Sequence, residues 1–138
     1  MRRLDHIDLR VTDRTGSIQF YKKICATIGF PHFENGKEWA CFCSRPYPQV
    51  GEYLALTEER GHRPSKVCYA FWVDSKADVD RVAQILRGID APAIEGPAMF
   101  YQGHYAVYFE DPSGNHLEVC YREYSSDFDP RISHEERA

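Results

Sequence analysis

Along the first half of the chain, the spacing of hydrophobic residues is typical of a strand in some segments and of a helix in another. Residues 4–11 alternate between apolar and polar side chains, which predicts a half-buried strand. Apolar residues then recur at helical spacing from Ile18 to Ile28, and Gly29 provides a stop for the helix. Three further strands are predicted at residues 30–33, 39–43 and 53–57. The first half therefore has the predicted order βαβββ.

The same order begins again at residue 67. Residues 67–73 predict a strand, and a helical stripe from Val79 to Leu86 follows it and stops at Gly88. Three more strands are predicted at residues 93–95, 104–110 and 117–121. The second half is therefore also predicted to be βαβββ.

The two halves align with nearly the same offset at two separate anchors. His6 aligns with Cys68 at 62 residues, and Gly51 aligns with Gly114 at 63 residues. We interpret this as an internal repeat rather than a chance succession of elements. The predicted fold is α+β, with modules at residues 4–58 and 67–121 in one domain that spans residues 1–124. Residues 125–138 are predicted to be a polar tail.

The composition of the chain argues against several classes of function. The chain of 138 residues carries 17 basic and 21 acidic side chains, a net charge of −4, which argues against a nucleic-acid partner. It has no apolar run of membrane-spanning length and opens without a signal peptide, so we expect a cytoplasmic protein without a membrane partner. Its five cysteines predict reduced thiols. Cys41 and Cys43 share one strand face, and we interpret them as small structural residues rather than a functional pair.

The polar faces of the first and last strand of each module are predicted to look into a cavity. Polar groups on the inner face of a sheet are costly unless they have a partner, a metal or water, so these faces indicate a binding site. By alternation the candidate residues are His6, Asp8, Arg10, Tyr53, Ala55, Thr57, Cys68, Ala70, Trp72, His116, Glu118 and Cys120.

The tandem modules, the opening LDHIDLRV and the closing EDPSGNHLEV together resemble the glyoxalase/bleomycin-resistance/extradiol-dioxygenase superfamily, also called the vicinal oxygen chelate fold. The resemblance covers about residues 4–121 and implies a curved mixed sheet that forms a cup-shaped barrel. It places metal ligands at His6 and Glu118. The two remaining ligand positions of the family fall on Cys68 and Ala55, which depart from its pattern.

A divalent ion that keeps a position open for substrate normally has three protein ligands, and Ala55 cannot be one. A deprotonated Cys68 could complete a set with His6 and Glu118. The thiolate favours Zn²⁺, whereas the carboxylate also tolerates Fe²⁺, Mn²⁺ or Ni²⁺. An oxidisable thiolate beside activated oxygen is unfavourable, so the resemblance fits a dioxygenase less well.

Other candidate residues would contact a substrate. Glu118 could also act as a general base. Arg10 could bind an anionic group or pair with its neighbour Asp8. The aromatic residues Tyr53, Trp72 and Tyr105 could line a cavity for a planar molecule or pack in the core. His104 could contact the substrate or occupy an edge position.

These features lead to three functional hypotheses. The first is a metal-dependent lyase or isomerase that chelates two adjacent oxygens of a small molecule, with Glu118 as the catalytic residue. The second is a metal-free small-molecule binder of the bleomycin-resistance type. The third, a non-catalytic interaction domain, rests only on the polar tail. The resemblance also implies a homodimer.

Overall fold

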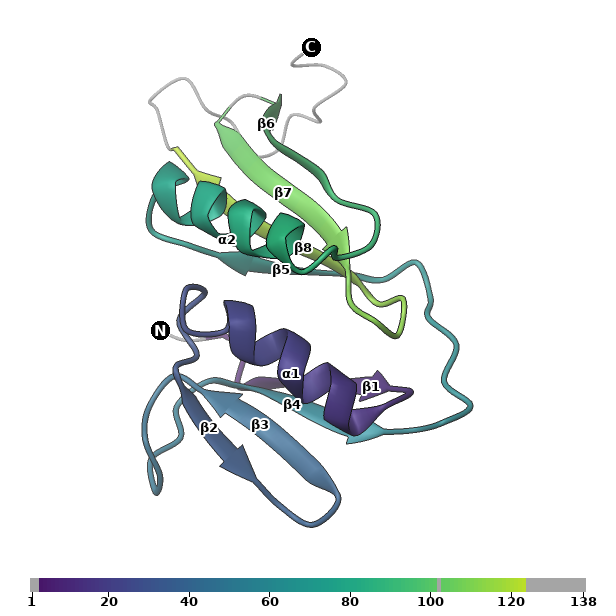
Figure 1. Cartoon of the computed structure of the whole chain (residues 1–138). Helices are drawn as coiled ribbons and strands as arrows, with labels where there is room; N and C mark the ends of the chain where they lie inside the picture. The colour runs from purple at the N-terminus through teal and green to yellow at the C-terminus, as the bar shows by residue number, and fades with distance from the viewer. Residues whose placement is uncertain (1–2, 102, 124–138) are drawn as a thin grey trace.

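A computed structural model describes residues 3–101 and 103–123, and it confirms two consecutive βαβββ modules (Figure 1). The predicted tail at residues 125–138 lies outside the described residues. The elements of the first module are β1 (His6–Val11), α1 (Arg14–Ile24), β2 (His32–Asn35), β3 (Trp39–Cys43) and β4 (Tyr53–Glu58). Those of the second are β5 (Cys68–Trp72), α2 (Lys76–Gly88), β6 (Glu95–Tyr101), β7 (His104–Glu110) and β8 (His116–Arg122).

The repeat is visible in how the strands pair. The sheets have the strand orders β1-β4-β3-β2 and β5-β8-β7-β6, and in each the first strand of the module runs parallel to the last. His6 lies opposite Tyr53 in the first sheet, and Cys68 lies opposite His116 in the second. Equivalent strands therefore pair in equivalent register, as the sequence offsets predict.

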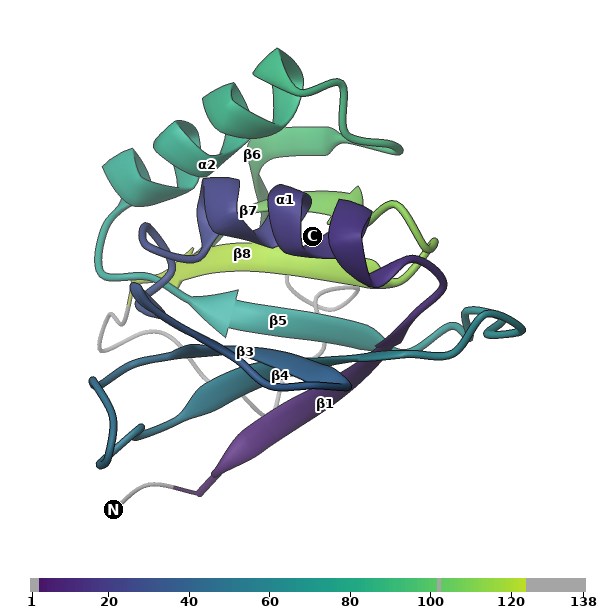
Figure 2. The same ribbon diagram turned by 60° about the horizontal axis from the view of Figure 1, so that its bottom comes forward.

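Both modules contribute to one hydrophobic core. The predicted helical stripes supply Tyr21 and Ile24 from α1 and Val79 from α2, all fully or almost fully buried. Phe20 of α1 packs on Phe109 of β7, with ring centroids 6.2 Å apart, so the helix of one module contacts the sheet of the other. Figure 2 shows α1 next to α2. In the described part of the chain, neither helix is long and apolar enough to span a membrane.

The structure corrects the boundaries of several elements. The strand predicted at residues 30–33 is β2 and lies at His32–Asn35. The strand predicted at residues 93–95 shares only Glu95 with β6, which extends from Glu95 to Tyr101 and includes the Gly96-Pro97 pair. Proline is tolerated there because β6 is the edge strand of its sheet and its register with β7 is irregular. The first helix also ends earlier than predicted, at Ile24, and hydrogen-bonded turns lead from it to Gly29.

A buried carboxylate lies in the turn between β7 and β8, which we call the inter-module turn (residues 111–115). Asp111 is 1% exposed, and its Oδ2 accepts a hydrogen bond of 2.7 Å from the Tyr21 hydroxyl of α1. The same oxygen accepts a bond of 2.9 Å from the Asn115 amide, while Oδ1 accepts two backbone N–H groups of the turn. Asp111 therefore holds the turn together and fastens it to the first module.

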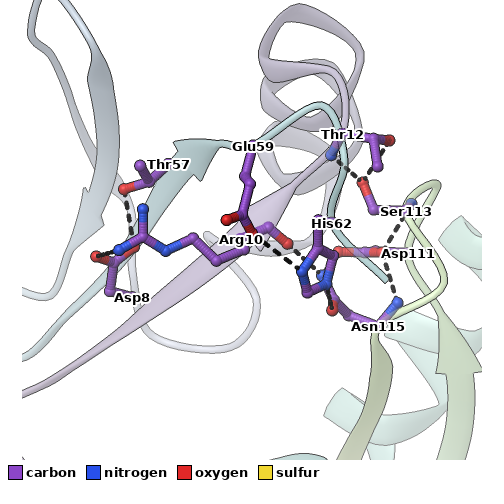
Figure 3. A network of polar contacts seen from close by, with 9 residues as sticks. All are labelled: Asp8, Arg10, Thr12, Thr57, Glu59, His62, Asp111, Ser113 and Asn115. Atoms are coloured by element: carbon purple, nitrogen blue, oxygen red, sulfur yellow. Dashed lines mark hydrogen bonds and ion pairs between the residues drawn. The ribbon is translucent and has the colours of Figure 1, made fainter. Parts of the chain in front are cut away.

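Side chains of the same turn also contact the end of β1 (Figure 3). The Asn115 amide donates to the Arg10 carbonyl at 2.9 Å, and the Thr12 N–H donates to the Ser113 hydroxyl at 2.9 Å. His62, in the connection between the modules, lies 3.0 Å from the Asn115 side-chain oxygen. The closing motif of the sequence is thus mainly a structural link between the two halves.

Candidate functional site

The outer face of the second sheet is turned away from the helices. It carries several side chains that can bind a metal or transfer a proton. We call it the second-sheet face. Alternation on the strands places core residues such as Phe71 and Val119 on the opposite side. The second-sheet face is formed by Cys68, Ala70, Trp72, His104, Ala106, Tyr108, His116, Glu118 and Cys120.

Glu118 lies at the centre of this face and is only 7% exposed. Its Oε1 is 2.6 Å from Nε2 of His104, and the Tyr108 hydroxyl also donates to the carboxylate. Burial raises the pKa of Glu118, but the hydrogen bonds from His104 and Tyr108 outweigh it and hold the pKa below its ordinary value. Glu118 is therefore an oriented, ionised carboxylate.

His104 is 1% exposed and stacks on Tyr101, with ring centroids 4.4 Å apart. Because the carboxylate of Glu118 accepts a hydrogen bond, the proton of a neutral His104 ring belongs on Nε2. Its Nδ1 is buried and has no hydrogen-bond partner within the described residues. An imidazole held by a carboxylate through one nitrogen, with the other nitrogen free, has the arrangement that metal-binding histidines commonly adopt.

Two thiols accompany this pair. Donor atoms of His104, Glu118 and Cys120 lie within 4.8 Å of one another. Burial, with the charge of Glu118, raises the pKa of Cys120 to about 11. The same causes raise the pKa of Cys68, which lies exposed on the neighbouring strand. Imidazole, carboxylate and thiol are the donor types of zinc sites, so these residues fit a divalent ion that displaces a thiol proton.

A cavity of about 570 Å³ lies on the outer face of the first sheet, and we call it the first-sheet pocket. Its residues all belong to the first module: His6, Asp8, Glu34, Trp39, Cys41, Tyr47, Val50, Tyr53, Ala55 and Thr57. His6 stacks on Tyr53 with ring centroids 4.6 Å apart. The pocket is therefore bordered by aromatic rings and several polar groups.

A family model described as the Glyoxalase/Bleomycin resistance protein/Dioxygenase superfamily matches residues 3–119. The chain belongs to this superfamily. The match covers most of the chain and both modules, which confirms the resemblance that the opening and closing motifs indicate. A search of curated proteins found no match.

Solved structures of the superfamily share the fold at low sequence identity. A glyoxalase/bleomycin resistance protein from Albidiferax ferrireducens is 20% identical, with a TM-score of 0.73 over 87% of this chain and 98% of its own. A glyoxalase/dioxygenase from Nostoc punctiforme is 23% identical, with a TM-score of 0.63 over 89% and 92%. The fosfomycin resistance protein FosX from Mesorhizobium loti is 18% identical, with a TM-score of 0.65 over 89% and 94%. These similarities support the fold.

The residues predicted from the superfamily pattern are distributed over two surfaces. Cys68 and Glu118 share the second-sheet face, where Trp72 is 57% exposed. His6 and Tyr53 line the first-sheet pocket, and both also border a smaller cavity of about 180 Å³ with Ala70 and Trp72 of β5. Within this chain, His6 is therefore not among the donors gathered around Glu118.

Two other predicted substrate contacts have local partners. The Arg10 guanidinium lies 3.6 Å from Asp8, the pairing that the sequence leaves open (Figure 3). Tyr105 lies on the core side of β7, where its hydroxyl donates to Asp80 of α2. The structure therefore does not bring Tyr105 to the face that carries His104.

Sequence reasoning did not identify several residues of the two surfaces as site residues. Glu34, Trp39 and Tyr47 line the first-sheet pocket. The alternation in β3 could have found Trp39, because it shares the face of Cys41. The pairing of His104 with Glu118 had no such signal, since both faces of β7 carry aromatic residues.

Proposed function

We propose that the protein is a metal-dependent lyase or isomerase of the glyoxalase superfamily that acts on a small molecule with two adjacent oxygen atoms. The oriented carboxylate of Glu118 is the observation that carries this proposal. His104 and Tyr108 supply its hydrogen bonds, and two thiols lie beside it. A buried carboxylate with this support suits metal binding and proton transfer better than a purely structural role.

The proposed metal ligands are Glu118, Cys68 and His6. A bound Zn²⁺, Fe²⁺, Mn²⁺ or Ni²⁺ ion would supply Lewis-acid polarisation of the substrate oxygens. The protein's part is to hold the carboxylate in place through His104 and Tyr108. A carboxylate oxygen of Glu118 would accept a proton from a substrate carbon next to a carbonyl group.

The proposed ligand set requires two copies of the chain, because within one chain His6 is not among the donors that lie close to Glu118. We place the first-sheet pocket of one copy against the second-sheet face of another. Trp39 at the pocket is 47% exposed, and Trp72 on the second-sheet face is 57% exposed. Large exposed apolar side chains on both surfaces support a homodimer contact.

Metal uptake tests the proposal without knowledge of the substrate. The chelator-treated full chain is dialysed against Zn²⁺, Mn²⁺, Ni²⁺ or Fe²⁺, and bound metal is measured by elemental analysis. We expect an ion at this centre in every chain, and we expect Glu118→Gln and His6→Ala each to lose it. Glu59→Gln, the same change at a carboxylate that is 58% exposed and lies outside both surfaces, should retain it.

A mixture of Glu118→Gln and His6→Ala, the two variants expected to lose the metal, tests whether the site is shared between two chains. Random exchange between Glu118→Gln and His6→Ala chains gives about one half mixed dimers, each with one intact centre of two. About one quarter of the wild-type metal content at this centre should therefore return. A folded wild-type protein that takes up none of the four metals would contradict the proposed centre, and a mixture that recovers nothing would contradict the dimer.

A metal-free binding protein is the second candidate, and the aromatic first-sheet pocket favours it. Trp39, Tyr47 and Tyr53 surround a cavity of about 570 Å³, a size suited to a small planar ligand. A thermal-shift screen of aromatic compounds in the presence of chelator distinguishes the two functions. A stabilising ligand that acts equally on Glu118→Gln would support the binder. Fosfomycin should be assayed separately as a candidate substrate of the metal-loaded protein, because the fosfomycin resistance protein FosX shares the fold.

A further inference from the structure

Two thiols of β3 touch one another on the pocket side of the first sheet. Cys41 and Cys43 point the same way because one residue separates them, and that residue, Phe42, packs on Tyr21 in the core. The Sγ atoms of the two cysteines lie 3.5 Å apart. Cys41 lines the pocket, and Cys43 is fully buried behind it. The pocket therefore has a pair of thiols in its wall.

Strand geometry disfavours a disulfide between them. Two residues along a strand advance about 6.4–6.8 Å, which is the upper end of the Cα separation that a disulfide usually spans. The bond would require the strand to contract while its neighbours β2 and β4 hold it in register. The pair is therefore better suited to hold an ion between two sulfur atoms.

The sulfur separation fits a thiophilic ion. Sulfur atoms 3.5 Å apart subtend an angle of about 100° at an ion with bonds of about 2.3 Å, close to the tetrahedral angle of about 109°. A linear two-coordinate ion would need the sulfurs about 4.6 Å apart with bonds of that length. The spacing thus favours Zn²⁺ or Cd²⁺ over a linear Cu⁺ centre.

The third donor of the site comes from the neighbouring strand. Glu34 of β2 is the register partner of Cys41, and both side chains line the pocket. Its carboxylate does not lie within 4.8 Å of both sulfur atoms in the structure, so Glu34 has to change its rotamer to bind the same ion. On the other side of Cys41, the register partner is Ala55, whose small side chain leaves room beside the thiol. The fourth position of a tetrahedral ion would face the cavity, where water or a ligand can enter.

We propose that Cys41, Cys43 and Glu34 bind one thiophilic divalent ion of the Zn²⁺ or Cd²⁺ type at the first-sheet pocket. Each cysteine forms a metal–sulfur bond and releases its thiol proton, so two protons leave for every ion bound. The carboxylate contributes an oxygen donor without releasing a proton. This site shares no ligand with the proposed centre at Glu118, and it needs only one copy of the chain.

Proton release makes binding strongly dependent on pH. Burial and the hydrogen bond with Cys43 raise the pKa of Cys41 to about 12, so its thiol is protonated at neutral pH. Because two protons leave for every ion bound, the apparent affinity should rise with pH, by up to about 100-fold for each pH unit.

A cadmium titration of the reduced, metal-free full chain tests the site. The sulfur-to-cadmium charge-transfer absorbance reports thiolate ligation directly. In the wild type, we expect a component of this absorbance that saturates at one equivalent of cadmium per chain. It should be lost in Cys41→Ala and in Cys43→Ala. In Glu34→Gln the affinity for cadmium should fall about tenfold. Cys25→Ala is the matched control, because it removes a buried thiol on the core side of the sheet.

Further variants separate this site from the second-sheet face. The component should persist in the Glu118→Gln and Cys120→Ala proteins. Cys41→Ser and Cys43→Ser preserve side-chain size, and thermal unfolding without metal confirms that each variant is folded. Absence of a cadmium–thiolate component in the wild type would overturn the proposal. It would also be overturned if the component persisted in the folded Cys41 and Cys43 variants, or disappeared with Cys120→Ala instead.

Discussion

Tyr21 shows how one side chain contributes to the contact between the modules. Its ring is fully buried in the core, yet its hydroxyl reaches Asp111 at 2.7 Å. Asp111 in turn accepts bonds from the Asn115 amide and from two backbone N–H groups of its turn. A carboxylate with this many donors can remain buried without a counter-ion, so Tyr21 is one of the groups that stabilise it.

Loss of the Tyr21 hydroxyl should destabilise the protein. Tyr21→Phe keeps the ring in the core but leaves Asp111 one donor short, at an expected cost of about 1–3 kcal/mol. Urea unfolding at neutral pH measures the change in free energy. Tyr47→Phe is the control, because its ring is 74% exposed, and it should change the stability by less than about 0.5 kcal/mol. Equal stabilities for the two variants would contradict the role of Tyr21.

The same residue should contribute to loss of stability at alkaline pH. Burial, and then the charge of Asp111, raises the pKa of Tyr21 well above 10.0. The unfolded chain releases this proton at about pH 10 while the folded chain retains it, so its contribution to stability falls as the pH rises above that value. The slope of stability against pH above 10 should be shallower in Tyr21→Phe than in Tyr47→Phe.

Strands bounded by clear turn signals are the elements that the sequence predicts best. Both β3 and β7 have their predicted limits, because Asn35-Gly36 precedes β3 and the turn at residues 111–114 follows β7. The strand predicted at residues 93–95 overlaps β6 only at Glu95, since Gly96-Pro97 is a break signal that an edge strand tolerates. Alternation alone cannot recognise this tolerance, because it depends on the strand's position in the sheet.

Local patterns also explain how far the candidate site could be predicted. His6 and Glu118 were assigned to the polar faces of their strands, opposite the core, and the structure places them there. Which groups meet Glu118 was not predictable, because its side-chain bond partner His104 lies on β7, whose facing the aromatic pattern leaves open. The separation of His6 from Glu118 depends on module packing, which no local pattern encodes.

Gly114 is the backbone position on which the inter-module turn depends. Its φ is +85°, and a Cβ there would lie 2.9 Å from Cγ of Pro64. Gly114→Ala should therefore cost about 1–3 kcal/mol, through left-handed backbone strain and a close contact. Gly61→Ala is the matched control, because a Cβ at Gly61 meets nothing within 4 Å. Chemical denaturation of both variants checks this prediction, and comparable losses would contradict it.

At the scale of the whole molecule, Asn115 links several segments with one side chain. It donates to the Arg10 carbonyl and to Asp111, and its oxygen lies 3.0 Å from Nε2 of His62 (Figure 3). These contacts join the end of β1, the connection between the modules and the second sheet. They therefore act on how the modules pack rather than on either module alone.

Asn115→Ala should weaken this packing more than a comparable loss on one sheet. We expect about 2–4 kcal/mol, because a 5% exposed side chain loses several bonds and leaves buried partners unpaired. Thermal unfolding and hydrogen exchange at the Arg10 and Thr12 region measure the effect. The comparison is Thr57→Val, which removes one exposed bond of 2.9 Å to Asp8 within the first sheet. A smaller loss for Asn115→Ala than for Thr57→Val would contradict this view.

The core shared by the two modules has a consequence for the history of the chain. A single βαβββ unit would expose to water the apolar surface around Phe109, on which Phe20 of α1 now packs. If the repeat arose by gene duplication, the ancestral unit would have needed a second copy of itself to cover that surface. Fusion then turned an association between two molecules into a contact within one, which removed its dependence on protein concentration. The inter-module turn and its Asp111 would have been refined after that fusion.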